Sequence, residues 1–204
     1  MKQFILLFLL MISSAVFSQT VGDLFKSMPA ELLPGVSEGN KTMLLVDTGK
    51  TAVPYPLGEI QKVAQSDDYL QIKTSDIGTT QLKLLPMGND SVIVCLIKTV
   101  CGGVCDSHLS FYTTDWKKLN SEAFLPDVSA EIFFNSSRKK SENDKYAVSL
   151  PDIYPISAAF NEKGTDLTLI FHYKERLTEA QIEELKPLLK SDSVILTWDN
   201  ASFR

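Results

Sequence analysis

Apolar and polar residues alternate along the centre of the chain, and this pattern predicts β-strands. A period of two runs through residues 69–74 and again through 81–84, on either side of a turn at 76–78. Residues 91–97 are apolar and β-branched on both faces, which is typical of a central strand that is covered on both sides. A fourth strand is expected at 107–113. Four strands joined by short turns predict an antiparallel meander.

The C-terminal part has strand and helix signals of its own. The runs 153–160 and 166–173 flank a polar turn that ends in glycine, and together they predict a hairpin. A helix is expected over 178–189, because a threonine cap is followed three residues later by a glutamine, as in a capping box. Pro187 is expected to kink or end this helix. Residues 193–198 are expected to form a last strand.

The N-terminal part predicts helices and extended loops. Thr20 and Asp23 have the spacing of a capping box ahead of apolar residues, and Pro29 ends that helix early. Residues 43–46 predict a short buried element whose type the pattern leaves open. Two prolines keep residues 53–58 extended.

These signals combine into one prediction of fold class. We expect a single α+β domain over residues 19–204, with a mainly antiparallel meander sheet of seven or eight strands, N-terminal helices and one C-terminal helix. Residues 135–145 are polar and charged without periodicity, which predicts a mobile loop.

The first 18 residues change the picture of where the protein resides. Lys2 provides a charged start, residues 4–12 form an apolar core, and small residues precede an expected cleavage before Gln19, so residues 1–18 predict a signal peptide. The apolar run is shorter than the roughly 20 residues that span a bilayer. We therefore expect a periplasmic or secreted protein with no transmembrane segment in the mature chain.

Composition narrows the class of partner. The formal net charge is −5 at pH 7, and 44% of residues are hydrophobic. This balance is ordinary for a globular protein, and so mild a charge makes neither nucleic acid nor an anionic membrane an expected partner. The chain has three cysteines, so at most one internal disulfide is expected.

Two of the cysteines flank a glycine turn. If Gly102-Gly103-Val104 is a three-residue hairpin loop, Cys101 lies opposite Cys105. Facing Cα atoms in antiparallel strands are about 4.5–5.5 Å apart, within the range of about 4.4–6.8 Å that disulfides favour. We favour a structural disulfide. Free thiols are one alternative, and metal binding or redox chemistry is another.

This hairpin register separates the candidate residues into two faces. Cys95 then faces Phe111 on an apolar face and becomes a buried thiol. On the other face Lys98 lies opposite His108, with Asp106 nearby. A solvated sheet face is favoured there over a polar binding site.

The run Asp106-Ser107-His108 contains the three residue types of a hydrolase triad. Neighbours on a strand point to opposite faces, so Ser107 and His108 cannot touch. A triad would require His172 from the C-terminal hairpin, and nothing in the sequence places it near Ser107. The ligand spacing of structural zinc is missing. We predict no catalytic residue, no metal site and no cofactor.

Several motifs carry a family resemblance. They are Leu82-Lys83-Leu84-Leu85-Pro86, Thr99 to Ser107 around the cysteine turn, Phe111-Tyr112, Asp115-Trp116, and Trp198 near Phe203. The chain resembles the domain of unknown function 3256, a family of exported Bacteroidales proteins, over nearly the whole mature length. This resemblance implies a Gram-negative envelope and carries over no functional residue.

We expect a non-enzymatic envelope protein that binds another protein or a glycan through a sheet face or a loop surface. The alternative is a hydrolase whose site is assembled from distant residues, with His108 or His172 as the base. The two tryptophans, Trp116 and Trp198, are expected to anchor the core rather than to hold a sugar.

Overall fold

A computed structural model describes residues 19–47, 49–56, 58–128, 130–135 and 155–204. The predicted signal peptide, and the predicted loop 135–145 apart from its first residue, lie outside the described residues. Within the described part of the chain, no helix is both long enough and apolar enough to cross a membrane.

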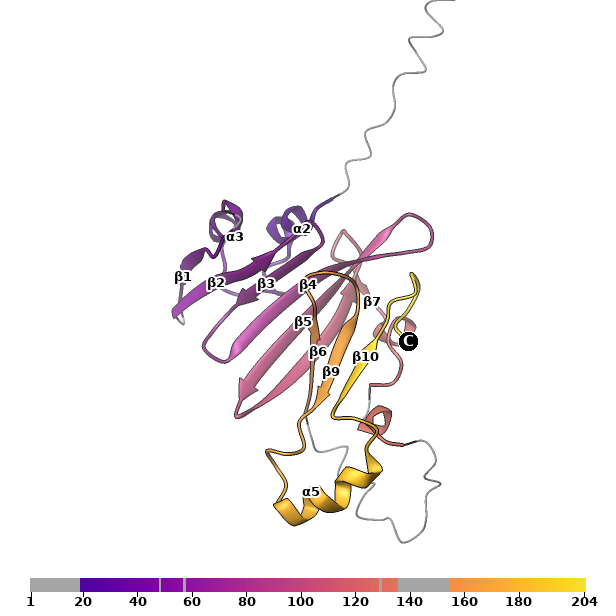
Figure 1. Cartoon of the computed structure of the whole chain (residues 1–204). Helices are drawn as coiled ribbons and strands as arrows, with labels where there is room; N and C mark the ends of the chain where they lie inside the picture. The colour runs from indigo at the N-terminus through magenta and orange to yellow at the C-terminus, as the bar shows by residue number, and fades with distance from the viewer. Residues whose placement is uncertain (1–18, 48, 57, 129, 136–154) are drawn as a thin grey trace, which may run out of the picture.

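The predicted α+β fold with an antiparallel meander is confirmed (Figure 1). Seven strands follow one another in sequence order in a large sheet. They are β1 (Ala52–Tyr55), β2 (Gly58–Gln65), β3 (Tyr69–Lys73), β4 (Gly78–Pro86), β5 (Val92–Gly102), β6 (Val104–Tyr112) and β7 (Lys118–Leu119). Each pairs antiparallel with the next, as short connections dictate.

The C-terminal strands form a separate small sheet. It consists of β8 (Ile156–Phe160), β9 (Leu167–Phe171) and β10 (Ser193–Leu196), in the order β10-β9-β8. The sequence pattern predicts these strands but does not separate them from the large sheet.

The helices and 3-10 turns lie outside the two sheets. They are α2 (Val21–Ser27), α3 (Glu38–Leu45), α5 (Glu179–Leu185), η2 (Ser121–Ala123), η3 (Ala130–Phe133) and η5 (Lys186–Leu188). Both predicted capping boxes are present, with Thr20 and Asp23 at α2 and with Thr178 and Gln181 at α5. The helix predicted to reach residue 189 ends as η5, where Pro187 interrupts the α-helical ladder.

The large sheet is covered on both faces, as its central apolar strand predicts. On one face, side chains of α2 and α3 pack against residues such as Leu70, Leu82 and Leu96. On the other face, the small sheet and the C-terminal residues pack against Cys95, Ile97 and Phe111, among others. Figure 1 shows α2 and α3 beside the first strands and α5 at the opposite end of the view.

Polar side chains of the large sheet accept hydrogen bonds from backbone amides along the outer edge of β8. Ser107 Oγ accepts a hydrogen bond from the Ala158 amide at 2.9 Å, and Gln81 Oε1 accepts one from the Phe160 amide at 2.9 Å. An unpaired strand edge is a site of unwanted association. These side chains therefore protect β8 and fix the small sheet on the large one.

A buried lysine adds a third link between the sheets. Lys83 Nζ lies 2.7 Å from Asp68 Oδ2 and donates to the Glu162 carbonyl at 3.3 Å, in the turn between β8 and β9. The lysine side chain is fully buried. The two partners therefore offset the free-energy cost of burying its charge.

Two N-terminal predictions differ from the structure. Residues 43–46, expected to be buried, form the C-terminal end of α3; only Leu44 is fully buried, whereas Met43 and Val46 are exposed. Strand β2 was not predicted, because Lys62 occupies a buried position in its alternating pattern. The Lys62 ammonium donates to the Asp47 carbonyl and to Gln65 Oε1, which makes this burial possible.

Candidate functional site

The cysteine turn closes a tight hairpin between β5 and β6. Cys101 and Cys105 are paired across the strands and joined by a disulfide, with a Cα–Cα distance of 4.0 Å. Gly103 sits at the tip with φ of 88°, a conformation that favours glycine. The predicted register is confirmed throughout the hairpin.

Cys95 is the free cysteine of the described residues, and it is fully buried. It pairs with Phe111 and belongs to the apolar cluster beneath the small sheet. Burial raises the pKa of the Cys95 thiol far above its ordinary value. The thiolate that would act as a nucleophile or metal ligand is therefore strongly disfavoured.

The opposite face of the hairpin emerges from beneath the helices near its tip. Val94 and Leu96 are buried among α2 and α3 residues, but Val100 on the same face is 55% exposed. Lys98 lies directly opposite His108, and Val100 lies opposite Asp106. We call Lys98, Val100, Asp106 and His108 the hairpin-tip patch.

Ser107 points away from this patch, as strand parity predicts. Its Oγ lies 2.7 Å from Thr99 Oγ1 and accepts from the Ala158 amide of β8. His108 is exposed on the other side of the strand. The sequence neighbours Asp106, Ser107 and His108 therefore do not form a triad.

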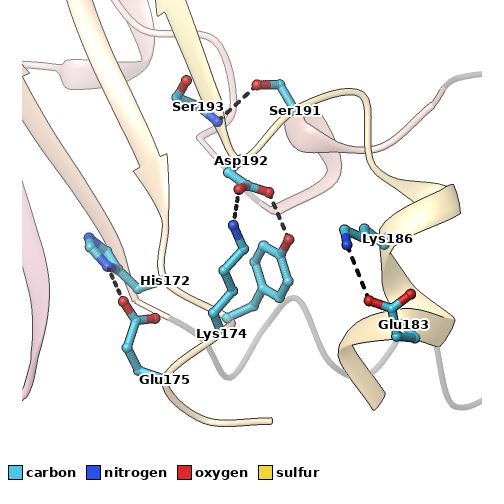
Figure 2. Close-up of polar contacts among 9 residues, drawn as sticks. His172, Lys174, Glu175, Glu183, Lys186, Ser191, Asp192 and Ser193 are labelled. Carbon is cyan, nitrogen blue, oxygen red and sulfur yellow. Dashed lines mark hydrogen bonds and ion pairs between the residues drawn. The ribbon is translucent and has the colours of Figure 1, made fainter. Parts of the chain in front are cut away.

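The second histidine has different neighbours. His172 follows β9, and its Nε2 lies 2.8 Å from Ser157 Oγ of β8. Its Nδ1 lies 3.5 Å from Glu175 Oε1, a contact drawn as a dashed line in Figure 2. The structure thus joins Ser157 of β8 to His172, and His172 to Glu175, just beyond the end of β9.

The residues after His172 are fixed by a second polar group. The Tyr173 hydroxyl donates to Asp192 Oδ1 at 2.7 Å, and the Lys174 ammonium pairs with the other oxygen (Figure 2). Hydrogen bonds from Lys174 and then Tyr173 lower the pKa of Asp192 below its ordinary value. Burial and the hydrogen bond to Asp192 raise the pKa of Tyr173, so both groups keep the protonation states that this contact needs.

Sequence reasoning did not single out Ser157 or Glu175. They lie 15 residues and three residues from His172, and no motif links them. The signal that could have found Ser157 is the register of the predicted hairpin. Pairing Phe160 with Leu167 places Ser157 opposite Ile170, on the same face as His172.

The tryptophans have the structural roles expected of them. Trp198 is buried, packs edge-on against Phe203, and donates its indole N–H to the Pro86 carbonyl. Trp116 packs against Tyr112, and its indole nitrogen lies 3.2 Å from Ser27 Oγ. Among the described residues, no cluster of three or more His, Cys, Asp or Glu side chains has the arrangement of a metal site.

The seven-stranded antiparallel meander, covered by helices on one face and by a small sheet on the other, defines the class of protein as α+β. Residues 13–203 match the family model described as Protein of unknown function (DUF3256), and the chain belongs to this family.

The fold is also similar to a solved structure, that of a domain of an uncharacterized protein from Porphyromonas gingivalis W83. The two chains are 21% identical, with a TM-score of 0.76 over 90% of this chain and 96% of the other. Comparison with curated proteins gives no match. The similarity therefore supports the fold and leaves the function to be argued from the residues.

Proposed function

We propose that this protein is an exported component of the cell envelope that binds another protein through the hairpin-tip patch. The observation that carries the proposal is Val100, a large aliphatic side chain left 55% exposed on a strand whose other apolar residues are covered. Exposed apolar surface with a polar rim is typical of interaction sites.

Export is supported by two independent features. Residues 1–18 have the sequence pattern of a signal peptide, and Cys101 and Cys105 form a disulfide, which persists in oxidising compartments. Both features support a mature chain that resides in the periplasm or outside the cell. N-terminal sequencing of the mature protein should begin at Gln19, whereas a retained Met1 would contradict export by this signal.

The hairpin is stiff enough to present the patch without a large ordering cost. Strands β5 and β6 are paired over nine positions, and the disulfide closes the tip. Rigid elements lose little conformational entropy on binding. Binding energy from even a small apolar contact is therefore not consumed in ordering the hairpin.

The chemistry of the patch favours a protein over a glycan. An aliphatic residue surrounded by Lys98, Asp106 and His108 offers one apolar contact with charges of both signs beside it. Sugars are usually held against aromatic rings, and in the described part of the chain every large hydrophobic side chain that is exposed is aliphatic. A protein surface of mixed polarity fits this patch better.

The test is cross-linking of the tagged mature protein in envelope extract, followed by quantitative mass spectrometry. Val100→Asp should lower recovery of the specific partners at least about tenfold, which corresponds to about 1.4 kcal/mol. The matched control is Val46→Asp, because Val46 is 80% exposed at the end of α3 and lies outside the patch. Equal recovery by the two variants would exclude the patch as the binding surface.

The hydrolase alternative with His108 as base receives no support from the hairpin. The cross-strand neighbour of His108 is Lys98, and Ser107 lies on the other face of the sheet.

A further inference from the structure

We propose that Ser157 is a nucleophilic serine activated by His172, and that the outer face of the small sheet accepts the acyl group of small, neutral, apolar esters. This site is separate from the hairpin-tip patch and does not depend on the proposed binding function. It rests on the contacts of three residues and on the character of the surface beside them.

The three residues are connected in the order that nucleophilic catalysis requires. Glu175 contacts His172 at Nδ1 and Ser157 contacts it at Nε2, at 3.5 Å and 2.8 Å respectively. A carboxylate at Nδ1 favours the tautomer that carries its proton there. The unprotonated Nε2 then accepts the hydrogen bond of the Ser157 hydroxyl, which is the arrangement of a general base beside its nucleophile.

The imidazole is held in place by its own backbone and by the next residue. The His172 amide donates to the Pro155 carbonyl at 3.1 Å, which fixes it beside the start of β8. Tyr173 is only 1% exposed and is anchored by its hydrogen bond to Asp192. The Arg176 amide donates to the Tyr173 carbonyl at 3.1 Å and closes the turn that carries Glu175. Glu175 is thus a positioning residue.

The site remains open to solvent-borne reagents. The His172 side chain is 15% exposed and Glu175 47% exposed, and Ser157 is half-buried on the outer face of β8. Ser107 is also half-buried, but its hydroxyl is engaged by Thr99 and by the backbone of β8. Ser157 is therefore the serine placed to react, because its hydroxyl contacts a histidine and that of Ser107 contacts Thr99 and the Ala158 amide.

The neighbouring surface determines the substrate class. Ser157 lies directly opposite Ile170, and Ile195 lies on the same outer face one strand further. These isoleucines are 41% and 63% exposed, and Ala159 beside them is also exposed. The strand residues of this face are uncharged, so nothing in them would hold a carboxylate or phosphate. An apolar acyl chain of a neutral ester fits this surface.

The reaction balances with water as the co-substrate. Ser157 Oγ forms a bond to the ester carbonyl carbon while its proton moves to His172 Nε2. The carbon–oxygen bond to the alcohol breaks, and the departing oxygen takes the proton from His172. Water then attacks the acyl-serine by the same route, which releases the carboxylic acid and restores the serine.

The test uses the purified mature chain with p-nitrophenyl butyrate, and it measures nitrophenolate release and acylation of each residue by peptide mass spectrometry. We expect butyryl transfer to Ser157. The corresponding peptide of Ser157→Ala should carry no butyryl group. His172→Asn should slow acylation at least about 100-fold, the usual contribution of a general base. Glu175→Gln should slow it less, because Glu175 acts through His172.

The matched control is Ser193→Ala. Ser193 is exposed on the same face of the small sheet, opposite Ile170, but no contact joins it to a histidine. Acylation of Ser157 in this variant should equal that of the unaltered protein. The proposal is overturned if the unaltered protein shows neither acylation of Ser157 nor faster nitrophenolate release than Ser157→Ala, or if His172→Asn, shown by circular dichroism to be folded, reacts at an unchanged rate.

Discussion

The two histidines of the described chain each belong to a hairpin, but their chemical surroundings differ. His108 lies on β6 between Asp106 and Ser110, opposite a lysine, with the adjacent serine on the far side of the sheet. His172 follows β9 and contacts Ser157 and Glu175 on one face. The contiguous residues Ser107 and His108 lie on opposite faces and do not touch, whereas Ser157 and His172, 15 positions apart, are in contact. In a β-sheet, cross-strand neighbours decide chemistry more than sequence neighbours do.

The largest expected effect separates the two histidines directly. His172→Asn should reduce acylation of Ser157 by p-nitrophenyl butyrate at least about 100-fold, because it removes the proton acceptor. His108→Asn should leave the rate unchanged, since His108 contacts neither Ser157 nor its face of the molecule. Initial rates of nitrophenolate release from both variants, side by side, measure the difference. Equal losses in the two variants would contradict the comparison.

The next largest effect is a difference in the free energy of unfolding between substitutions at two adjacent residues of β6. Ser107→Ala should lower the free energy of unfolding by about 1–3 kcal/mol, because the Ala158 amide loses its hydrogen-bond acceptor at the junction of the sheets. His108→Ala, at an exposed position, should change it by less than about 0.5 kcal/mol. Urea denaturation followed by tryptophan fluorescence gives both values. A larger cost for His108→Ala would mean that the faces are wrongly assigned.

Removing the disulfide tests the tip of the first hairpin. The double variant Cys101→Ala with Cys105→Ala should cost about 2 kcal/mol, since the closed loop is short and restricts the unfolded chain only modestly. The acylation rate at Ser157 should not change, because the small sheet does not contain the tip. A loss of stability well above this value would show that the tip does more than fix the register. The measurement is urea denaturation of the oxidised protein and the double variant.

The smallest effect concerns the polar contact behind His172. The pKa of Asp192 is lowered from its ordinary value of 3.8 in the folded protein, so near this pH the unfolded state binds more protons. The stabilisation is therefore complete above the unfolded pKa and is lost as pH falls through the folded pKa. Because the side chain is 45% exposed, the effect is small. Asp192→Asn should flatten the fall in stability below about pH 4, as measured by thermal unfolding across a pH series; an unchanged slope would contradict it.

Much of the fold could be predicted because its signals are local. The alternating run of β3, the apolar β5 and the capping boxes at Thr20 and Thr178 each fix an element from neighbouring residues. Strand β2 was not predicted, because a lysine at position 62 indicates a solvent-facing residue although its side chain is buried. Its burial depends on the Asp47 carbonyl, 15 residues away.

The candidate sites also differ in whether local or distant contacts determine them. The disulfide and the split of Ser107 from His108 follow from a three-residue turn, whose register the sequence specifies. The contact between Ser157 and His172 depends on how a longer turn aligns β8 with β9. The separation into two sheets depends on long-range contacts of Gln81, Lys83 and Ser107 with β8 and its turn. Contacts between residues so far apart do not produce a periodic pattern in the sequence, so they could not be predicted from it.

The most direct test of the central comparison is competition between two serines for one reagent. The folded mature protein is treated with an alkyl fluorophosphonate, and the modified peptides are quantified by mass spectrometry. We predict modification at Ser157 and none at Ser107, with the Ser157 adduct lost in His172→Asn and retained in His108→Asn. Modification of Ser107, or an unmodified Ser157, would contradict the claim that cross-strand contacts select the reactive serine.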